Sequence, residues 1–268
     1  MAYFTTSDNV KLYYETFGAG QKTILFIHGW MDSGDSFKTA AGELAENYQI
    51  IVYDHRGHGR SETPKEGYNM TRLAMDLRDL IEFLSPEKLT LVGYSMGSHV
   101  IYEYIKLFGD ADLDKVVITV MSPTLVNEAR PERYLGCGLT GKMALARLAA
   151  NNQYYVEGCE AAYPAYITTH APNERLREYY AKAAKLDSGA MVRLGIAMYA
   201  ADYWDVLPAF TRPTLILSAD EDIYPRACHE EQARLIPNAR VVIIEGCGHM
   251  LLMEKPEEYR KELSKFIQ

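Results

Sequence analysis

Six short apolar runs rich in β-branched residues constrain the fold of this chain more than any other feature of its sequence. They occupy residues 23–27, 49–53, 89–93, 115–120, 214–217 and 240–244. Runs of this kind are typical of strands buried on both faces, as in a parallel sheet. Segments with apolar residues at helical spacing separate or follow them, at 36–47, 70–84, 97–108, 226–236 and 256–267. This alternation predicts an α/β fold with a doubly wound, mostly parallel sheet.

Two regions depart from the alternation. Residues 3–16 have the pattern of an antiparallel hairpin, with Asp8 and Asn9 at its turn. Residues 122–205 contain no strand-like run, and Ala, Arg, Tyr and Glu recur there at helical spacing. We therefore expect residues 1–121 and 206–268 to form the core and residues 122–205 to form an inserted helical cap. The cap aromatics either pack helix on helix or line a pocket against the sheet: Tyr154, Tyr155, Tyr163, Tyr166, Tyr179, Tyr180, Tyr199, Tyr203 and Trp204.

Charge and composition exclude several classes of partner. The 268 residues include 28 Lys and Arg and 36 Asp and Glu, which gives a net charge of −8. An acidic chain repels phosphate backbones and anionic lipid, so we expect neither nucleic acid nor a membrane as the partner. The first residues carry no signal-peptide pattern, and no apolar stretch reaches the roughly 18 residues of a membrane span. These features favour a cytoplasmic location, and they leave the oligomeric state open.

The four cysteines are too sparse for a disulfide framework and show no CxxC spacing. We expect most of them to be reduced, buried, small apolar side chains: Cys137, Cys159, Cys228 and Cys247. The same spacing argues against a structural zinc site. We therefore predict neither a metal nor a cofactor.

The pentapeptide GYSMG at 93–97 is the most informative segment, because it joins a predicted strand to a predicted helix. A serine on a sharp strand-to-helix turn projects its hydroxyl above the sheet, so the residues two positions before and after it must be small. The N-terminus of the following helix also directs N–H groups toward negative charge that forms there. Ser95 is therefore the predicted nucleophile.

A serine hydroxyl is a weak nucleophile without a base. The candidate bases are His28, His55, His58, His99, His170, His229 and His249. His249 follows the last apolar run and falls on the sheet edge that carries Ser95. His99 lies one turn into the helix and should point into its packing, and His28 should bond the backbone of the loop that follows it. We predict His249 as the base.

The third residue of a triad should be a carboxylate beyond the apolar run at 214–217, which satisfies the chain order serine, acid, histidine. Asp220, Glu221 and Asp222 all follow that run. Asp220 lies at the strand-to-loop bend, where a short side chain tends to cap the local backbone. We predict Asp222 as the acid that fixes the tautomer of the histidine and stabilises its charged form.

The predicted oxyanion site lies beside the elbow. The run at 23–27 ends in the sequence HGW, where Gly29 lets the backbone turn close to the serine. The backbone N–H groups of Trp30 and Met96 are the two candidate donors. Each preorganised donor of this kind typically contributes about 3 kcal/mol to transition-state stabilisation.

With these motifs together, the chain resembles the α/β-hydrolase superfamily over nearly its whole length. The segment YDHRGHGRS at 53–61 looks like the D-x-R-G-x-G-x-S loop of the superfamily, and 248–256 looks like its G-H-x(4)-E-x-P ending. The pair HGW and GYSMG looks most like the cofactor-free haloperoxidase and aryl-esterase branch. That branch uses a Trp and a Met at the oxyanion site, which implies the same roles for Trp30 and Met96. Ser98 stands where a third glycine is common in the branch.

The resemblance implies a serine hydrolase that cleaves a small carboxylic ester through an acyl-enzyme, with perhydrolysis as a side activity. Ser95 in place of an aspartate disfavours the alkyl-enzyme chemistry of relatives that open epoxides or remove halides. Lactonase, amidase and carbon–carbon bond hydrolase activities use the same triad and remain open. A small-molecule receptor with slow or no turnover is the alternative of a different class.

Overall fold

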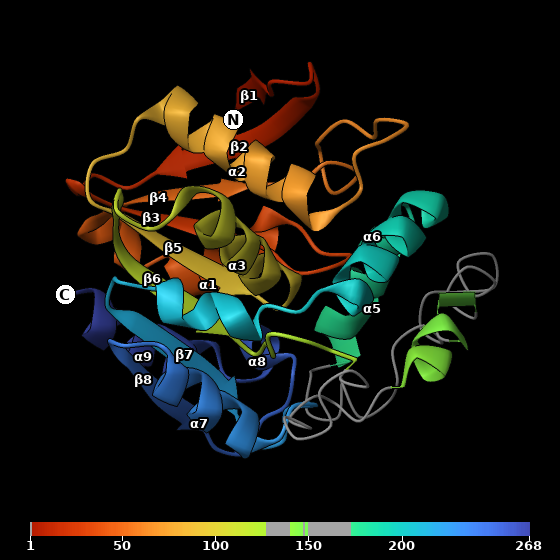
Figure 1. Ribbon diagram of the computed structural model, residues 1–268. Coiled ribbons are helices and arrows are strands. Elements are labelled where there is room, and N and C mark those ends of the chain that lie inside the picture. Colours follow the sequence, from red (N-terminus) through yellow and green to blue (C-terminus); the bar gives the residue numbers. More distant parts are fainter. Residues whose placement is uncertain (1, 127–139, 147, 150–172) are drawn as a thin grey trace.

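The computed structural model describes residues 2–126, 140–146, 148–149 and 173–268. Within these ranges eight strands form one sheet in the order β1-β2-β4-β3-β5-β6-β7-β8 (Figure 1). Their bounds are β1 (Ala2–Thr5), β2 (Lys11–Phe17), β3 (Lys22–Ile27), β4 (Tyr48–Tyr53), β5 (Leu89–Tyr94), β6 (Leu113–Thr119), β7 (Thr214–Ala219) and β8 (Ala239–Ile244). β2 is antiparallel to β1 and β4, and the pairs from β4–β3 to β7–β8 are parallel. The predicted α/β fold is confirmed.

Helices cover both faces of the sheet. Successive residues of a strand point to opposite faces, and in the central strands both sets of side chains are apolar and need to be buried. In β3, Leu25 and Ile27 enter one apolar cluster, whereas Ile24 and Phe26 enter the other. The first cluster includes side chains of α2 (Met70–Leu84), α3 (Met96–Phe108) and α7 (Arg226–Leu235), and the second those of α1 (Lys38–Ala41) and α9 (Pro256–Ile267). Short helical turns complete the core: η1 (Gly34–Phe37), η2 (Leu44–Glu46), η6 (Trp204–Ala209) and α8 (Leu251–Glu254).

The helix predicted at 36–47 is wrong as a continuous element. The structure breaks this segment into η1, α1 and η2. Gly42 lies in its middle and lowers helix propensity, and the Ser36 hydroxyl donates to the Asp32 carboxylate near its start. The bounds of α2 and α9 agree with the prediction, and those of the six predicted strands agree within two residues. The turn α8 was not predicted.

The N-terminal hairpin is confirmed, and an ion pair with the buried Arg56 attaches it to the core. β1 and β2 flank a turn in which Asn9 adopts a φ of 65°, a conformation that asparagine tolerates. Arg56, from the predicted D-x-R-G loop, donates to Asp8 in this turn at 2.9 Å and to Asp76 of α2 at 2.7 Å. The side chains of Arg56 and Asp76 are fully buried, so this motif joins the hairpin, the loop after β4 and α2.

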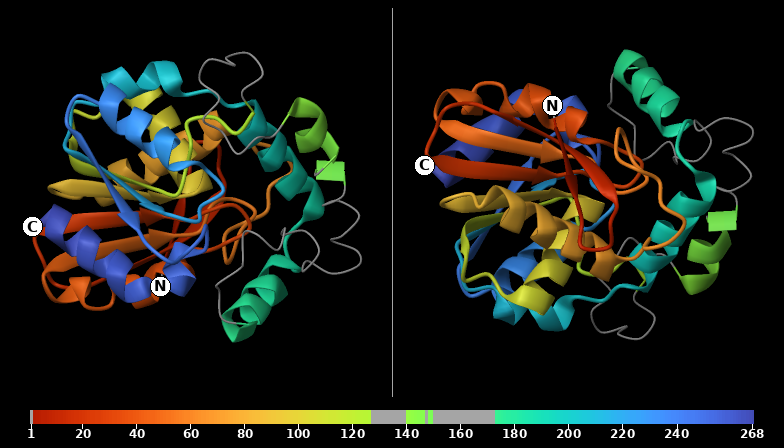
Figure 2. Two further views of the ribbon diagram at one scale, coloured as in Figure 1. Left: turned by 90° about the horizontal axis from the view of Figure 1, so that it is seen from below. Right: turned by 90° about the horizontal axis from the view of Figure 1, so that it is seen from above.

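Between β6 and β7 the chain forms α5 (Asn173–Ala183) and α6 (Ser188–Ala200), and residues 141–146 and 148–149 are also helical. These helices lie beyond one end of the sheet (Figure 2). Thr124 and Asp202 form an antiparallel bridge that brings the two ends of this segment together. In the part of the chain that the structure describes, no helix is long and apolar enough to cross a membrane.

Candidate active site

Ser95 lies on a strained turn between β5 and α3, with a φ of 51° and a ψ of −120°. The two flanking glycines are required by contact distance. A Cβ on Gly97 would lie 2.0 Å from the Ile27 carbonyl oxygen, and one on Gly93 would lie 2.7 Å from the Ser98 amide nitrogen. Only glycine lets β3, β5 and α3 approach so closely, as the steric argument from GYSMG predicts.

The structure brings the three predicted triad residues together. The Ser95 hydroxyl lies 3.1 Å from Nε2 of His249, and Nδ1 of His249 lies 2.8 Å from Oδ1 of Asp222. The Asp222 side chain is fully buried and His249 is 8% exposed. In this geometry Nδ1–H donates to the carboxylate, so Nε2 is free to accept the serine proton.

The two neighbouring carboxylates of the loop have different environments. Asp220 accepts the Cys247 N–H at 3.2 Å and caps the local backbone, as predicted. Burial by itself raises the pKa of the Asp222 carboxyl, but the nearby His249 and His229 rings outweigh it and hold that pKa well below its usual range. Asp222 therefore stays ionised beside His249.

The loop that carries His249 is held from two sides. The Tyr94 hydroxyl, next to Ser95, donates to the His249 backbone carbonyl. The Gly248 N–H donates to Glu254 at 2.6 Å. The G-H-x(4)-E-x-P pattern contains both Gly248 and Glu254, so the sequence carries a signal for their contact. No local sequence pattern indicates the contact between Tyr94 and His249.

The predicted oxyanion residues lie next to Ser95. A Cβ on Gly29 would be 3.3 Å from the Ser95 Cβ, so the HGW segment touches the elbow. Met96 is the first residue of α3, where an N–H has no acceptor within its own helix. The Trp30 indole N–H donates to the Met191 carbonyl of α6 at 3.1 Å. A helix of the segment predicted to form a cap therefore contacts the residue that is predicted to hold the oxyanion.

The cap aromatics divide between the two predicted roles. Tyr203 and Trp204 are buried, and the Tyr203 ring lies 5.5 Å from the Tyr102 ring of α3, so both residues serve packing. The Tyr179 hydroxyl of α5 instead donates to the Trp30 carbonyl at 3.2 Å. Four of the predicted aromatics lie outside the described residues: Tyr154, Tyr155, Tyr163 and Tyr166.

Two cavities lie between α5 and the loops after β3 and β4. One, of about 180 Å³, is lined by Tyr94 and Met250, which are sequence neighbours of the nucleophile and the base. The other, of about 270 Å³, reaches the loop around His58. The residues that line both cavities are mostly charged: Asp32, Asp35, Tyr179 and Lys182.

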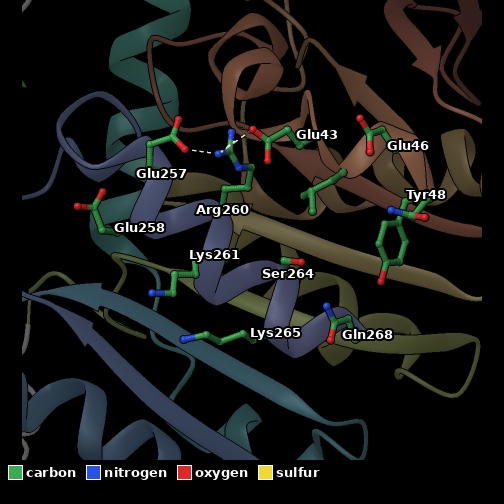
Figure 3. Close-up of a pocket in the computed structure, with 12 residues that line it drawn as sticks. Glu43, Glu46, Tyr48, Glu257, Glu258, Arg260, Lys261, Ser264, Lys265 and Gln268 are labelled. Atoms are coloured by element: carbon green, nitrogen blue, oxygen red, sulfur yellow. Dashed lines mark hydrogen bonds and ion pairs between the residues drawn. The ribbon is translucent and has the colours of Figure 1, made fainter.

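A groove of about 990 Å³ lies between η2 and α9, at the end of the sheet opposite to the elbow (Figure 3). Tyr48 in its wall begins β4, whereas Ser95 follows the carboxyl end of β5. Arg260 lies between Glu43 and Glu257 and forms ion pairs with both. This groove is remote from the candidate triad. Among the described residues no group of three metal-ligating side chains could hold a metal ion.

The predicted structural role of His28 is confirmed, and other buried histidines act in the same way. Nδ1–H of His28 donates to the Gly29 carbonyl at 2.7 Å, and Nε2 accepts the His55 N–H at 2.9 Å. Nε2 of His58 accepts the Met31 N–H at 3.2 Å and so holds the loop after β3. A ring that donates at one nitrogen and accepts at the other is neutral.

Burial lowers the pKa of four of these rings. The pKa values of His28 and His99 fall to about 4 and that of His58 to about 3, and the pKa of His55 is well below 6.5. The unfolded chain takes up these protons near pH 6.5, so it binds more protons than the folded protein below that pH. The free energy of unfolding should therefore fall as the pH falls from about 6.5 to 4.5. Asp32, whose pKa burial raises to about 6, and Asp76, whose pKa burial also raises, act in the opposite direction.

Urea unfolding at about pH 7.5 and pH 4.5 measures this effect. The lowered pKa values of His28 and His99 correspond to about 3 kcal/mol each when fully titrated, so a loss of several kcal/mol is expected across the window. Carboxyl groups with lowered pKa values lose their contribution to the free energy of unfolding mainly below about pH 4. Their effect can therefore be distinguished from that of the histidines. A free energy of unfolding that stays constant over this window would contradict the neutral buried rings.

Comparison with known proteins agrees with the fold and the motifs. The sequence profile of the alpha/beta hydrolase family matches residues 24–262. Non-heme chloroperoxidase CPO-A1 of Kitasatospora aureofaciens is 27% identical over 276 aligned positions, which cover 98% of each chain. A bromoperoxidase from Bacillus anthracis is 30% identical, with a TM-score of 0.85 over 99% of each chain. An esterase from Exiguobacterium antarcticum is 24% identical, with a TM-score of 0.91 over 99% of this chain and 98% of its own. The chain belongs to the alpha/beta hydrolase family.

Proposed function

We propose that this protein is a serine hydrolase that cleaves a small carboxylic ester through an acyl-enzyme. The continuous contact from the Ser95 hydroxyl through His249 to Asp222 carries the proposal, with distances of 3.1 and 2.8 Å. These contacts occur at a nucleophile elbow, which is the arrangement that activates a serine for acyl transfer. The family match and the haloperoxidase relatives support hydrolase chemistry of this branch.

In the proposed reaction Ser95 attacks the ester carbonyl while His249 takes the hydroxyl proton. The N–H groups of Trp30 and Met96 hold the oxyanion of the tetrahedral intermediate. His249 then returns the proton to the departing alcohol, which leaves an acyl group on Ser95. Water attacks this acyl group with His249 again as the base, and the carboxylic acid and the free serine are released. Asp222 stabilises the imidazolium in both halves of the reaction.

Perhydrolysis follows from the same intermediate. Hydrogen peroxide can replace water as the attacking group, and the acyl-enzyme then gives a peracid and the free serine. The non-heme chloroperoxidase and the bromoperoxidase among the relatives support this side activity. It needs no cofactor, because the acyl group and the peroxide supply all the atoms of the peracid.

A panel of p-nitrophenyl esters tests the proposal. Multiple turnovers on the acetate and butyrate esters are expected, and added hydrogen peroxide should divert part of the acyl product to peracid. A single slow turnover would instead indicate a small-molecule receptor. Inactivity on these esters together with multiple turnovers on lactones, anilides or β-diketones would assign the triad to another bond.

We also propose that residues 122–205 form a cap that sets substrate choice, and Tyr179 offers the test. This side chain lines both cavities and bonds the Trp30 carbonyl. Tyr179→Ala should change the butyrate-to-acetate rate ratio by about tenfold, since lost apolar contact acts on the longer acyl chain. Tyr203→Leu, a buried packing control, should lower stability and leave the ratio unchanged. An equal loss on both esters in Tyr179→Ala would mean that its ring serves packing alone.

A further inference from the structure

A second buried histidine faces the proposed triad acid from the side opposite to His249. Nε2 of His229, on α7, lies 2.8 Å from the Ser218 hydroxyl and 3.5 Å from Oδ2 of Asp222. The side chains of His229 and Asp222 are both fully buried. His249 approaches the other carboxylate oxygen, Oδ1, at 2.8 Å. The carboxylate therefore lies between two imidazole rings.

The donors in this cluster can be assigned from its contacts. The Ser218 hydroxyl donates its single proton to Oδ2 of Asp222 at 3.1 Å. The Ser218 oxygen must then accept at its 2.8 Å contact with His229, so Nε2 of that ring carries the hydrogen. Nδ1 of His229 faces the side-chain amide nitrogen of Gln232 at 3.4 Å, as an acceptor should. The Tyr102 hydroxyl donates to the Gln232 carbonyl oxygen at 2.7 Å, which fixes the orientation of that amide.

We propose that His229 is a positioning residue which, through Ser218, holds Oδ2 of Asp222 and keeps Oδ1 directed at His249. This inference rests on the proposed function of the triad. Oδ1 already accepts the Ile223 N–H at 2.7 Å in addition to His249. A buried carboxylate needs donors on both oxygens to remain charged and fixed, and Ser218 with His229 supplies those on Oδ2.

The groups that surround His229 determine which residues its substitution should affect. Asp222 faces it from the loop after β7, and His249 lies beyond that carboxylate. The Tyr224 ring of the same loop lies 6.2 Å from the His229 ring. On α7 itself, Cys228 is also buried, and Tyr102 of α3 is reached through Gln232. Asp222 is the charged group in direct contact, so the main effect should pass to the Asp222–His249 pair.

Three variants test the proposal on p-nitrophenyl acetate. His229→Leu removes the donor, so the Asp222–His249 pair should bind a proton more readily and the acid limb of kcat/KM should move up by about half a pH unit. kcat should fall about tenfold with KM unchanged, because the lost bond supports the transition state. His229→Gln keeps an N–H at the position of Nε2 and should restore most of both losses. Ser218→Ala should move the acid limb in the same direction.

A second readout separates this inference from the proposed function. The NMR titration of the His249 ring follows proton binding to the pair without any substrate, and its midpoint should also rise in His229→Leu and recover in His229→Gln. Ile236→Ala, a buried variant beyond the end of α7, controls for a general loss of stability and should leave the midpoint unchanged.

The possible outcomes lead to different conclusions. A wild-type protein without ester turnover whose midpoint still shifts in His229→Leu would overturn the proposed function and retain the role of His229. Normal turnover with an unmoved acid limb and midpoint in both His229→Leu and Ser218→Ala would overturn the role of His229. If His229→Leu does not fold, Ser218→Ala decides alone: an upward shift supports the role, and an unchanged limb and midpoint overturn it.

Discussion

Ser95→Ala is expected to lower kcat/KM on p-nitrophenyl acetate by at least about a hundredfold, and by up to about a millionfold. The substitution removes the atom that forms the acyl bond. It leaves the backbone contacts of the elbow intact, including the N–H of residue 95 that donates to the Thr119 carbonyl at 3.0 Å. The thermal midpoint should therefore change little while turnover is lost.

Ser264→Ala is the matched control for this variant. Ser264 is also a half-buried serine, but it lies on α9 at the other end of the sheet. Its removal should leave both activity and the thermal midpoint near those of the wild type. If Ser95→Ala retained more than about a hundredth of the wild-type rate, Ser95 would not be the nucleophile.

Asp222→Asn should lower kcat by about four orders of magnitude, whereas Asp220→Asn should lower it by less than about tenfold. An amide at 222 cannot accept from Nδ1–H in the same way, so His249 is left in the wrong tautomer. An amide at 220 still has a carbonyl oxygen to accept the Cys247 N–H at 3.2 Å. Parallel kinetics of the two variants, with urea unfolding to check stability, measure the difference.

Two other results would contradict the assignment of Asp222 as the triad acid. If Asp220→Asn were the more damaging change at unaltered stability, the acid would be Asp220 and the contact of Asp222 with His249 would be structural. Equal small losses in both variants would mean that neither carboxylate acts in a triad.

Most of the core was predictable because its signals are local. The apolar spacing in 70–84 gives the bounds of α2, since one buried face against the sheet decides that helix. In the segment 36–47, local hydrogen bonds and Gly42 outweigh the helical pattern, although Ala and Glu recur there. The charged lining contributed by Asp32 and Lys182 was not expected, because residues more than a hundred positions apart in the sequence meet there.

The candidate triad was predictable for a different reason. In a parallel sheet the carboxyl ends of the strands meet at one edge, so residues after three separate strands converge there. Ser95, Asp222 and His249 each follow the end of a strand. His229 lies within helix α7, and Ser218 lies within strand β7. Inside such elements no sequence pattern distinguishes a polar residue that contacts the site from one that only packs in the core. Only the three-dimensional contacts identify them.

Measuring the mass of the protein during turnover tests most directly whether Ser95 forms an acyl-enzyme. Wild-type protein mixed with p-nitrophenyl acetate and quenched in acid should gain one acetyl group, and peptide mapping should place it on Ser95. Ser95→Ala should gain none, and His249→Ala should gain it far more slowly because the base is missing. Turnover of the ester by the wild type with no acetyl group on Ser95, or with the group on another side chain, would contradict the covalent serine mechanism.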